Sequence, residues 1–149
     1  MTHALKRVET PADWETLHRL RETVLFAPLR HAGTVYDRDH PDDRAPAAVP
    51  FLLWHDGVPL GTARLDLRAE DAVIRLVAIA PQCQRQGHGR ALDRLLGEQA
   101  AAQGLRQLWV NAAPDAVLFY ERCGWQRATW DAGELTGIAA DCVQMGKRV

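Results

Sequence analysis

One strand-to-helix junction near the middle of the chain limits the folds that are open to it. Residues Ala72–Ala80 are almost all apolar, which is typical of a strand whose two faces are both covered. The run stops at Pro81, a short polar turn follows, and Gly89–Gln103 then repeats leucine and alanine at helical spacing. A buried strand that leads into a helix predicts an α/β fold.

Further elements surround this junction. Thr10 as an N-cap before Pro11 predicts a first helix. Phe51–Trp54 and Val58–Leu67, joined by the turn pair Asp56-Gly57, predict a hairpin. After the central helix we expect a strand, a short helix and two strands at residues 105–111, 114–122, 125–130 and 138–145. This order predicts a single α/β domain over residues 1–149 with a mixed sheet.

The connection over residues 27–50 is too long for a passive loop. It contains four prolines, and either it holds a short helix or it lines a site. Its acidic residues and histidine lack the spacing of an EF-hand calcium loop. The sequence therefore favours a solvated acidic loop over a metal site at Asp37, Asp39, His40, Asp42 and Asp43.

Composition excludes several classes of protein. Lys and Arg total 18 against 19 Asp and Glu, a balance that argues against a dedicated nucleic-acid binder. The three cysteines form no CxxC pair, which supports neither a zinc knuckle nor a disulfide framework. The N-terminal segment has no apolar signal region, and the chain has no apolar run of membrane-spanning length. A cytoplasmic protein is expected.

The turn between the central strand and helix has the features of an anion-binding site. Gly87 and Gly89 open the helix, so its free backbone N–H groups are not screened by a Cβ atom and the helix dipole lies behind them. Arg85 and Arg90 flank these glycines. Neither the dinucleotide pattern GxGxxG nor a P-loop is present. The turn predicts a cradle for phosphate or pyrophosphate.

Two segments together resemble a known family. Residues 84–89, Gln-Arg-Gln-Gly-His-Gly, match the pattern Gln/Arg-x-x-Gly-x-Gly/Ala after a strand that ends in Ala-Ile-Ala-Pro. Residues 111–125 contain a strand-end Asn, Phe-Tyr-Glu-Arg and a Gly-aromatic pair. On these residues the chain, over about Leu5–Lys147, resembles the GNAT superfamily of acyl-CoA-dependent N-acyltransferases. The resemblance implies three α+β layers, with a mixed, mostly antiparallel sheet, a central splayed strand pair and flanking helices.

The resemblance also implies a chemistry. A primary amine would attack the thioester of acetyl-CoA directly in a ternary complex, without a metal. The pantetheine arm would lie along the unpaired backbone of Val77 and Ile79, and the Val77 N–H would stabilise the oxyanion. The pyrophosphate would bind N–H groups at the start of the helix. The expected donor-site residues are Val77, Ile79, Gln84, Arg85, Gln86, Gly87, His88, Gly89, Arg90, Asn111 and Tyr120.

Individual residues carry alternative interpretations. Tyr120 is the expected general acid for the CoA thiolate, and the alternative is a tyrosine that only packs on the core. Asn111 is expected to contact the pantetheine amides or to cap the following helix. His88 is expected to face phosphate or solvent. Cys83 and Cys123 are interpreted as small packing residues.

The acceptor side is less defined by the sequence. The base that deprotonates the amine remains open among Asp66, Glu70, His31, His40 and a water chain. The acidic residues before the hairpin predict cationic acceptors such as polyamines, aminoglycosides or basic peptides.

One departure from the family and one alternative remain. The tail segment 137–141 lacks the histidine found in the small bacterial branch that the chain most resembles, so no role is transferred to it. A non-catalytic acyl-CoA-binding module is the alternative function; a nucleotide-binding domain is disfavoured because no base-recognition pattern is present. The resemblance allows a homodimer.

Overall fold

The computed structural model describes residues 2–26 and 35–149. In the described part, one sheet has the strand order β1-β2-β3-β4-β5-β7-β6. Only β4 and β5 are parallel neighbours; the other adjacent strands are antiparallel. The strands are β1 (His3–Arg7), β2 (Ala48–His55), β3 (Val58–Leu67), β4 (Asp71–Ile79), β5 (Gln107–Ala112), β6 (Gln126–Arg127) and β7 (Val143–Arg148).

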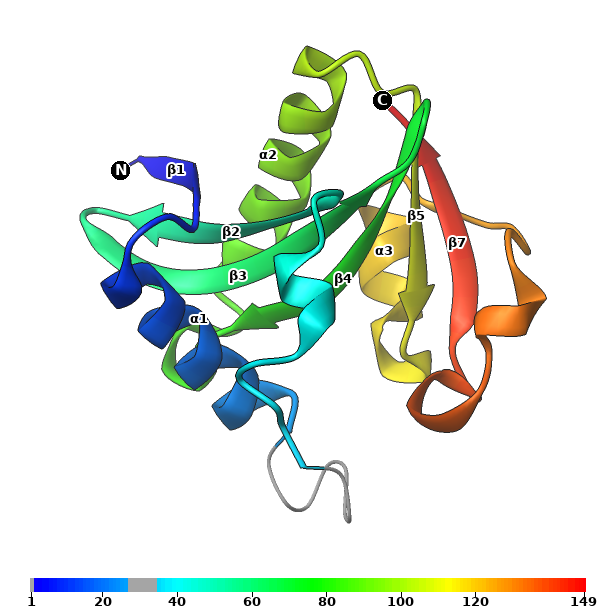
Figure 1. Cartoon of the computed structure of the whole chain (residues 1–149). Helices are drawn as coiled ribbons and strands as arrows, with labels where there is room; N and C mark the ends of the chain where they lie inside the picture. Colours follow the sequence, from blue (N-terminus) through cyan, green and yellow to red (C-terminus); the bar gives the residue numbers. More distant parts are fainter. Residues whose placement is uncertain (1, 27–34) are drawn as a thin grey trace.

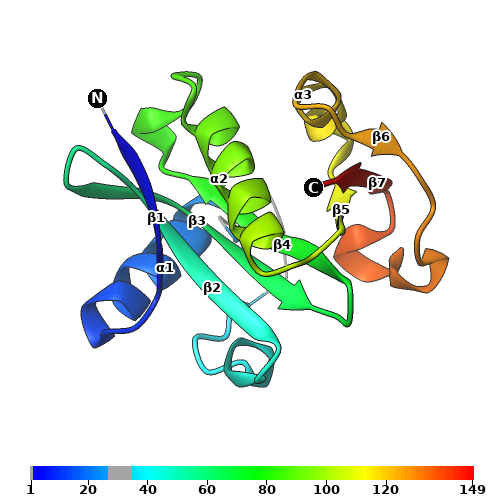
Figure 2. The same ribbon diagram turned by 90° about the horizontal axis from the view of Figure 1, so that it is seen from above.

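Helices cover both faces of this sheet. Figures 1 and 2 show α1 (Pro11–Val24) and α2 (His88–Ala102) on opposite sides of the central strands, with α3 (Val117–Arg122) beside β5. These three layers confirm the mixed, mostly antiparallel α/β arrangement expected from the sequence. None of the helices in the described ranges is both long and apolar enough to cross a lipid bilayer.

The first helix begins where its capping residues predict. Thr10 Oγ1 accepts a hydrogen bond from the Asp13 N–H at 3.1 Å, and the Asp13 carboxylate accepts one from the Thr10 N–H at 3.1 Å. This reciprocal pair is a capping box. α1 packs Leu17 on the core, and it also buries the guanidinium of Arg21, which requires an acidic partner under the sheet.

Strands β4 and β5 separate part-way along their length. Their pairing ends at Ile74 and Val110, and Figure 1 shows the two strands diverging beyond this point. Leu76 then adopts a left-handed φ of 55°, and the β3–β4 register shifts nearby. Such a β-bulge bends the strand and interrupts its ladder. Within the described sheet, Leu76 and Val77 are therefore outside the regular pairing on both sides, and the splayed pair is confirmed.

Several element boundaries differ from those expected. β1 is not predicted at all. The expected strand at 125–130 contains only the two residues of β6, and the expected strand at 138–145 begins as a short 3-10 turn, Gly137–Ala139, before β7. The long connection does contain a short helical turn, Pro41–Arg44; its residues 27–34 lie outside the described ranges.

Candidate functional site

The start of α2 leaves backbone donors without acceptors. Gly87 is the N-cap with a φ of 87°, and no side chain caps the helix. The first bond into the helix runs from the Ala91 N–H to the Gly87 carbonyl at 3.1 Å. The N–H groups of His88, Gly89 and Arg90 precede that bond, so they have no helical acceptor. This geometry can bind an anion at the helix N-terminus.

Side-chain hydrogen bonds hold the turn before α2 in shape. The Gln84 amide donates to the Ile79 carbonyl at 3.0 Å, and the Gln86 amide donates to the Gln82 carbonyl at 3.2 Å. Arg85 adopts a left-handed φ of 63°. The side chains of Gln84 and Gln86 therefore fix the turn itself, and the donors left for a ligand are those of the backbone.

His88 does not face phosphate or solvent as expected. Its side chain is buried, and its Nδ1 lies 2.8 Å from the Nε2 of His3. The ring points towards β1 because β1, which the sequence did not predict, occupies that edge of the sheet. Only the backbone N–H of His88 remains a candidate for the anion.

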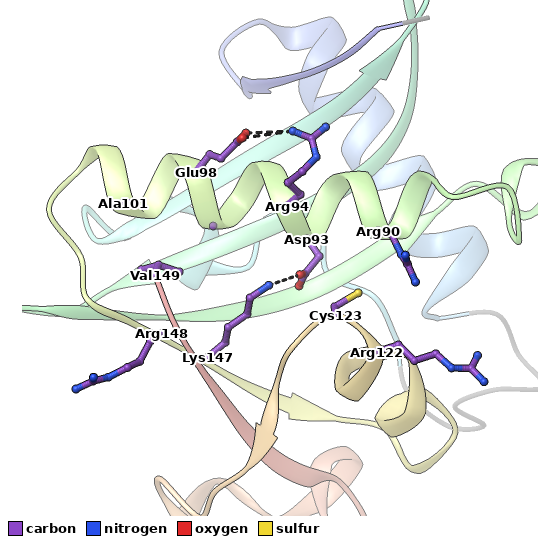
Figure 3. A pocket seen from close by; sticks show the side chains of 11 residues that line it. Arg90, Asp93, Arg94, Glu98, Ala101, Arg122, Cys123, Lys147, Arg148 and Val149 are labelled. Carbon is purple, nitrogen blue, oxygen red and sulfur yellow. Dashed lines mark hydrogen bonds and ion pairs between the residues drawn. The ribbon is translucent and has the colours of Figure 1, made fainter.

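A basic groove adjoins the start of α2. It has a volume of about 410 Å³ and lies between α2, the end of α3 and β7. Figure 3 shows Arg90 of α2 and Arg122 of α3 at one end of the groove, and the ion pair between Asp93 and Lys147 (3.0 Å) further along it, between α2 and β7. Arg90, in the first turn of α2, places positive charge next to the open helix N-terminus, and Arg122 adds positive charge to the same groove. Arg122 was not among the expected site residues, because nothing in the local sequence places it beside Arg90.

Tyr120 combines a packing contact with a protonated hydroxyl. The side chain is 8% exposed, and its ring meets Phe119 and Trp125 edge-on at centroid distances of 5.2 and 5.4 Å. Burial, with a further contribution from the Asp93 charge, raises the pKa of the Tyr120 hydroxyl far above its ordinary value. The packing interpretation therefore describes the ring, and the hydroxyl is protonated at neutral pH; its role as a general acid stays a prediction.

Glu134 bridges the two strands where their pairing ends. Its Oε1 accepts hydrogen bonds from Arg75 Nη1 at 2.8 Å and from Asn111 Nδ2 at 2.9 Å. These two residues directly follow Ile74 and Val110, the last paired positions of β4 and β5. The Asn111 side chain is thus engaged at the fork, where it also accepts a bond from Gln144, and it does not cap the next helix. Glu134 was not predicted.

Most of the chain matches a known protein family. The model of the Acetyltransferase (GNAT) family matches residues 14–125. The chain belongs to this family. Membership confirms the class expected from the sequence, an acyltransferase of the N-acetyltransferase type.

Individual relatives agree with this assignment. The uncharacterized protein YyaT of Bacillus subtilis is 25% identical over 122 residues, which cover 82% of each chain. The [ribosomal protein bS18]-alanine N-acetyltransferase of Escherichia coli is 33% identical over 84 residues, 53% of this chain and 55% of that one. The crystal structure of spermidine N-acetyltransferase from Vibrio cholerae in complex with CoA and spermine shares the fold, with a TM-score of 0.74 at 19% identity over 98% and 95% of the two chains.

A row of alternating charges crosses the α1 face of this GNAT sheet. Asp43 accepts hydrogen bonds from Arg21 and Arg64 at 2.9–3.0 Å, so it is buried and paired rather than solvated as expected. Burial opposes ionisation of Asp43, but the two arginines outweigh it and lower the pKa of the carboxyl. The complete row, called the ion-pair chain below, is Arg21, Asp43, Arg64, Asp66, Arg75 and Glu134.

The described candidates for the general base are poorly suited to that role. The Asp66 carboxylate accepts three bonds of 2.7–3.1 Å from Arg64 and Arg75. Glu70 is exposed in the turn between β3 and β4, at the opposite end of β4 from Val77. His40 is exposed and caps the Pro41–Arg44 turn.

Two candidates remain. His31 lies outside the described residues, so it and a water chain stay open as the base.

The cysteines of this GNAT domain have the character of packing residues. Cys83 and Cys123 are free and half-buried. Burial raises the pKa of the Cys123 thiol, which reduces its thiolate fraction and hence its nucleophilicity. Cys123 is therefore poorly suited to act as a nucleophile.

Proposed function

We propose that this GNAT protein transfers an acetyl group from acetyl-CoA to a primary amine by direct attack in a ternary complex. The observation that carries the proposal is that β4 has an unpaired stretch of backbone and leads into a helix whose N-terminal N–H groups are free. The β4–β5 ladder ends at Ile74 and Val110, and β4 leads into α2, which has Gly87 as its N-cap and no side-chain cap. An amide chain that ends in a pyrophosphate fits both features, because it needs a strand-like partner and an anion site.

The donor would be held by backbone groups. The pantetheine arm would run beside Val77, whose backbone lies in the bulge between the β3 and β5 pairings. The Ile79 carbonyl already accepts a bond from Gln84, so Val77 has the freer backbone of the two. The pyrophosphate would take the N–H groups from Gln86 to Arg90, and Arg90 and Arg122 would balance its charge.

Few protein groups take part in the proposed reaction. A neutral amine attacks the thioester carbon, a C–N bond forms, and the Val77 N–H stabilises the negative oxygen. The intermediate collapses with cleavage of the C–S bond, and Tyr120 donates its proton to the thiolate. The proton lost by the amine leaves through the base, for which a water chain is consistent with the described residues.

A pair of glycine variants tests the pyrophosphate site. Gly87→Val and Gly104→Val both place a side chain at a positive φ, 87° and 82°, where a Cβ meets nothing within 4 Å. Each should therefore cost a similar amount of stability, about 1–2 kcal/mol. CoA at 100 times its Kd should raise the midpoint of thermal unfolding of wild type by roughly 5–10 °C. Gly104→Val should keep that rise, and Gly87→Val should lose most of it.

Two results would contradict the proposed function. Equal CoA-dependent rises in both glycine variants would remove the pyrophosphate from the start of α2. Stabilisation by CoA without release of free thiol over a broad set of amines would instead favour the acyl-CoA-binding module.

A cationic acceptor is the class that we propose for the amine. The relatives named above act, by their names, on an alanine of a ribosomal protein and on spermidine. Asp43 is buried and cannot attract an acceptor from solution, but Asp37, Asp39 and Asp42 are exposed. Exposed carboxylates attract cations over about 10 Å at 0.1 M salt.

The acceptor preference is measured with matched amines. Spermidine or a basic peptide should give a higher kcat/KM than glutamate, and the advantage should shrink as salt is raised from 0.05 to about 0.5 M. Asp39→Asn should reduce the advantage and leave thermal stability unchanged. Turnover of glutamate at an equal or higher rate would contradict this preference.

A further inference from the structure

Three histidines from distant parts of the chain meet at one end of the sheet. His3 begins β1, His55 ends β2 and His88 begins α2. The antiparallel register places His3 directly opposite His55, so their side chains leave the same face. In Figure 2 the N-terminus, the turn after β2 and the start of α2 lie toward the same side of the molecule.

The ring nitrogens are close enough to share one ion. His3 Nε2 lies 2.8 Å from His88 Nδ1, and the His55 ring stacks on His3 with centroids 4.3 Å apart. One nitrogen from each ring lies within 4.8 Å of the other two. Tetrahedral zinc with Zn–N bonds of about 2.0–2.1 Å separates its ligand nitrogens by about 3.3 Å. The three nitrogens lie within 4.8 Å of one another, so the side chains have to rotate to bring them to this spacing around an ion.

One nitrogen of the cluster lacks any partner. In the described part of the chain, His55 Nδ1 is buried without a hydrogen bond, an arrangement that costs free energy unless something binds there. On the other side of the ring, His55 Nε2 faces the Asp56 carboxylate at 3.5 Å. A carboxylate that holds the proton on one ring nitrogen leaves a lone pair on the other, as in metal-binding histidines.

We propose that His3, His55 and His88 form a Zn²⁺ site with a fourth position open to water. Neutral imidazole is a preferred ligand of zinc, and the proton now shared by His3 and His88 moves to an outer ring nitrogen when the ion binds. No ligand spacing announces this site in the sequence, which is why no metal is expected there. The ion ties the edge strand β1 and the β2–β3 turn to the first residue of α2.

The test uses the untagged chain with zinc chloride as the probe. Calorimetric titration should give one zinc per chain, and zinc should raise the midpoint of thermal unfolding. Cobalt in its place should show the intense visible absorption of a four-coordinate ion. His55→Gln should weaken zinc binding by at least 10-fold, and Asp56→Asn by about 10-fold. His40→Gln, at an exposed histidine elsewhere, should leave zinc affinity unchanged.

Two results would overturn the site. Zinc affinity that is equal in His55→Gln and wild type would place the ion elsewhere, and the absence of saturable binding would mean that the histidines only pack together. His3→Gln, at the first residue of the edge strand β1, gives the same comparison if His55→Gln does not fold. None of these readouts depends on acetyl transfer, so the site stands or fails separately from the proposed function.

Discussion

Replacing Tyr120 by phenylalanine should lower kcat by about 10²–10⁴-fold and leave the free energy of unfolding nearly unchanged. The ring keeps its contacts with Phe119 and Trp125, and only the hydroxyl is lost. Burial raises the pKa of that hydroxyl, so it stays protonated over the whole neutral range. A thiolate whose thiol has a pKa of about 8.5 also departs unaided, so the variant should retain measurable activity.

Kinetics and unfolding of two variants separate the roles of Tyr120. Tyr120→Ala deletes a buried ring and should cost about 3–5 kcal/mol of stability. In Tyr120→Phe the KM for acetyl-CoA should stay within a few-fold of wild type. Because the pKa is raised, wild-type kcat should show no alkaline loss from Tyr120 below about pH 10. Full kcat in the phenylalanine variant would mean that another group protonates the thiolate.

Asp43→Asn should destabilise the protein by about 3–5 kcal/mol, the usual cost of removing one partner from a buried ion pair. Arg21 is 1% exposed and Arg64 5% exposed, and both lose their shared carboxylate. Arg64 would keep Asp66 as a partner, but Arg21 would keep only the Tyr36 hydroxyl among the described residues, and two of its guanidinium nitrogens already lack acceptors there. Asp42→Asn is the matched control; its side chain is exposed and its substitution should change stability by less than about 0.5 kcal/mol.

Asp43→Asn and wild type should also differ in how much stability they lose at low pH. Asp43 has a lowered pKa in the folded protein, so the unfolded chain takes up its proton first as the pH falls. Its contribution is fully present above the ordinary carboxyl pKa of about 3.9 and is lost as the pH falls through the folded value. Urea unfolding between pH 7 and 3 should therefore show a smaller acid loss in Asp43→Asn than in wild type. Parallel curves would mean that other carboxylates govern acid unfolding.

Local patterns were sufficient to predict the central strand, the turn after it and the helix that follows. The apolar run before Pro81, the paired glycines and the helix that follows predict β4, the turn and α2 because each depends on neighbours in sequence. The splay followed from the family resemblance rather than from any residue pattern. The short polar strand β1 was missed because His-Ala-Leu-Lys-Arg carries little alternation, and only pairing with β2 makes it a strand.

Polar contacts between residues far apart in the chain could not be predicted from the sequence. Asp43 lies in an acidic, proline-rich segment, and its burial depends on Arg21 from α1 and Arg64 from β3. Glu134 lies in a turn after β6, and its position at the fork of β4 and β5 depends on the whole sheet being formed. Residue type alone favours a solvated carboxylate at both positions.

The ion-pair chain has a consequence for how this protein can diverge. Its inner carboxylates, Asp43 and Asp66, are each shared by two guanidiniums, so a change of charge at one position leaves two partners unbalanced. During evolution, neighbouring residues of the ion-pair chain therefore have to change together, because a protein with only one of them replaced is less stable. In homologues, charges at these positions should change in concert, and a sequence that has lost one member should have lost an adjacent one as well.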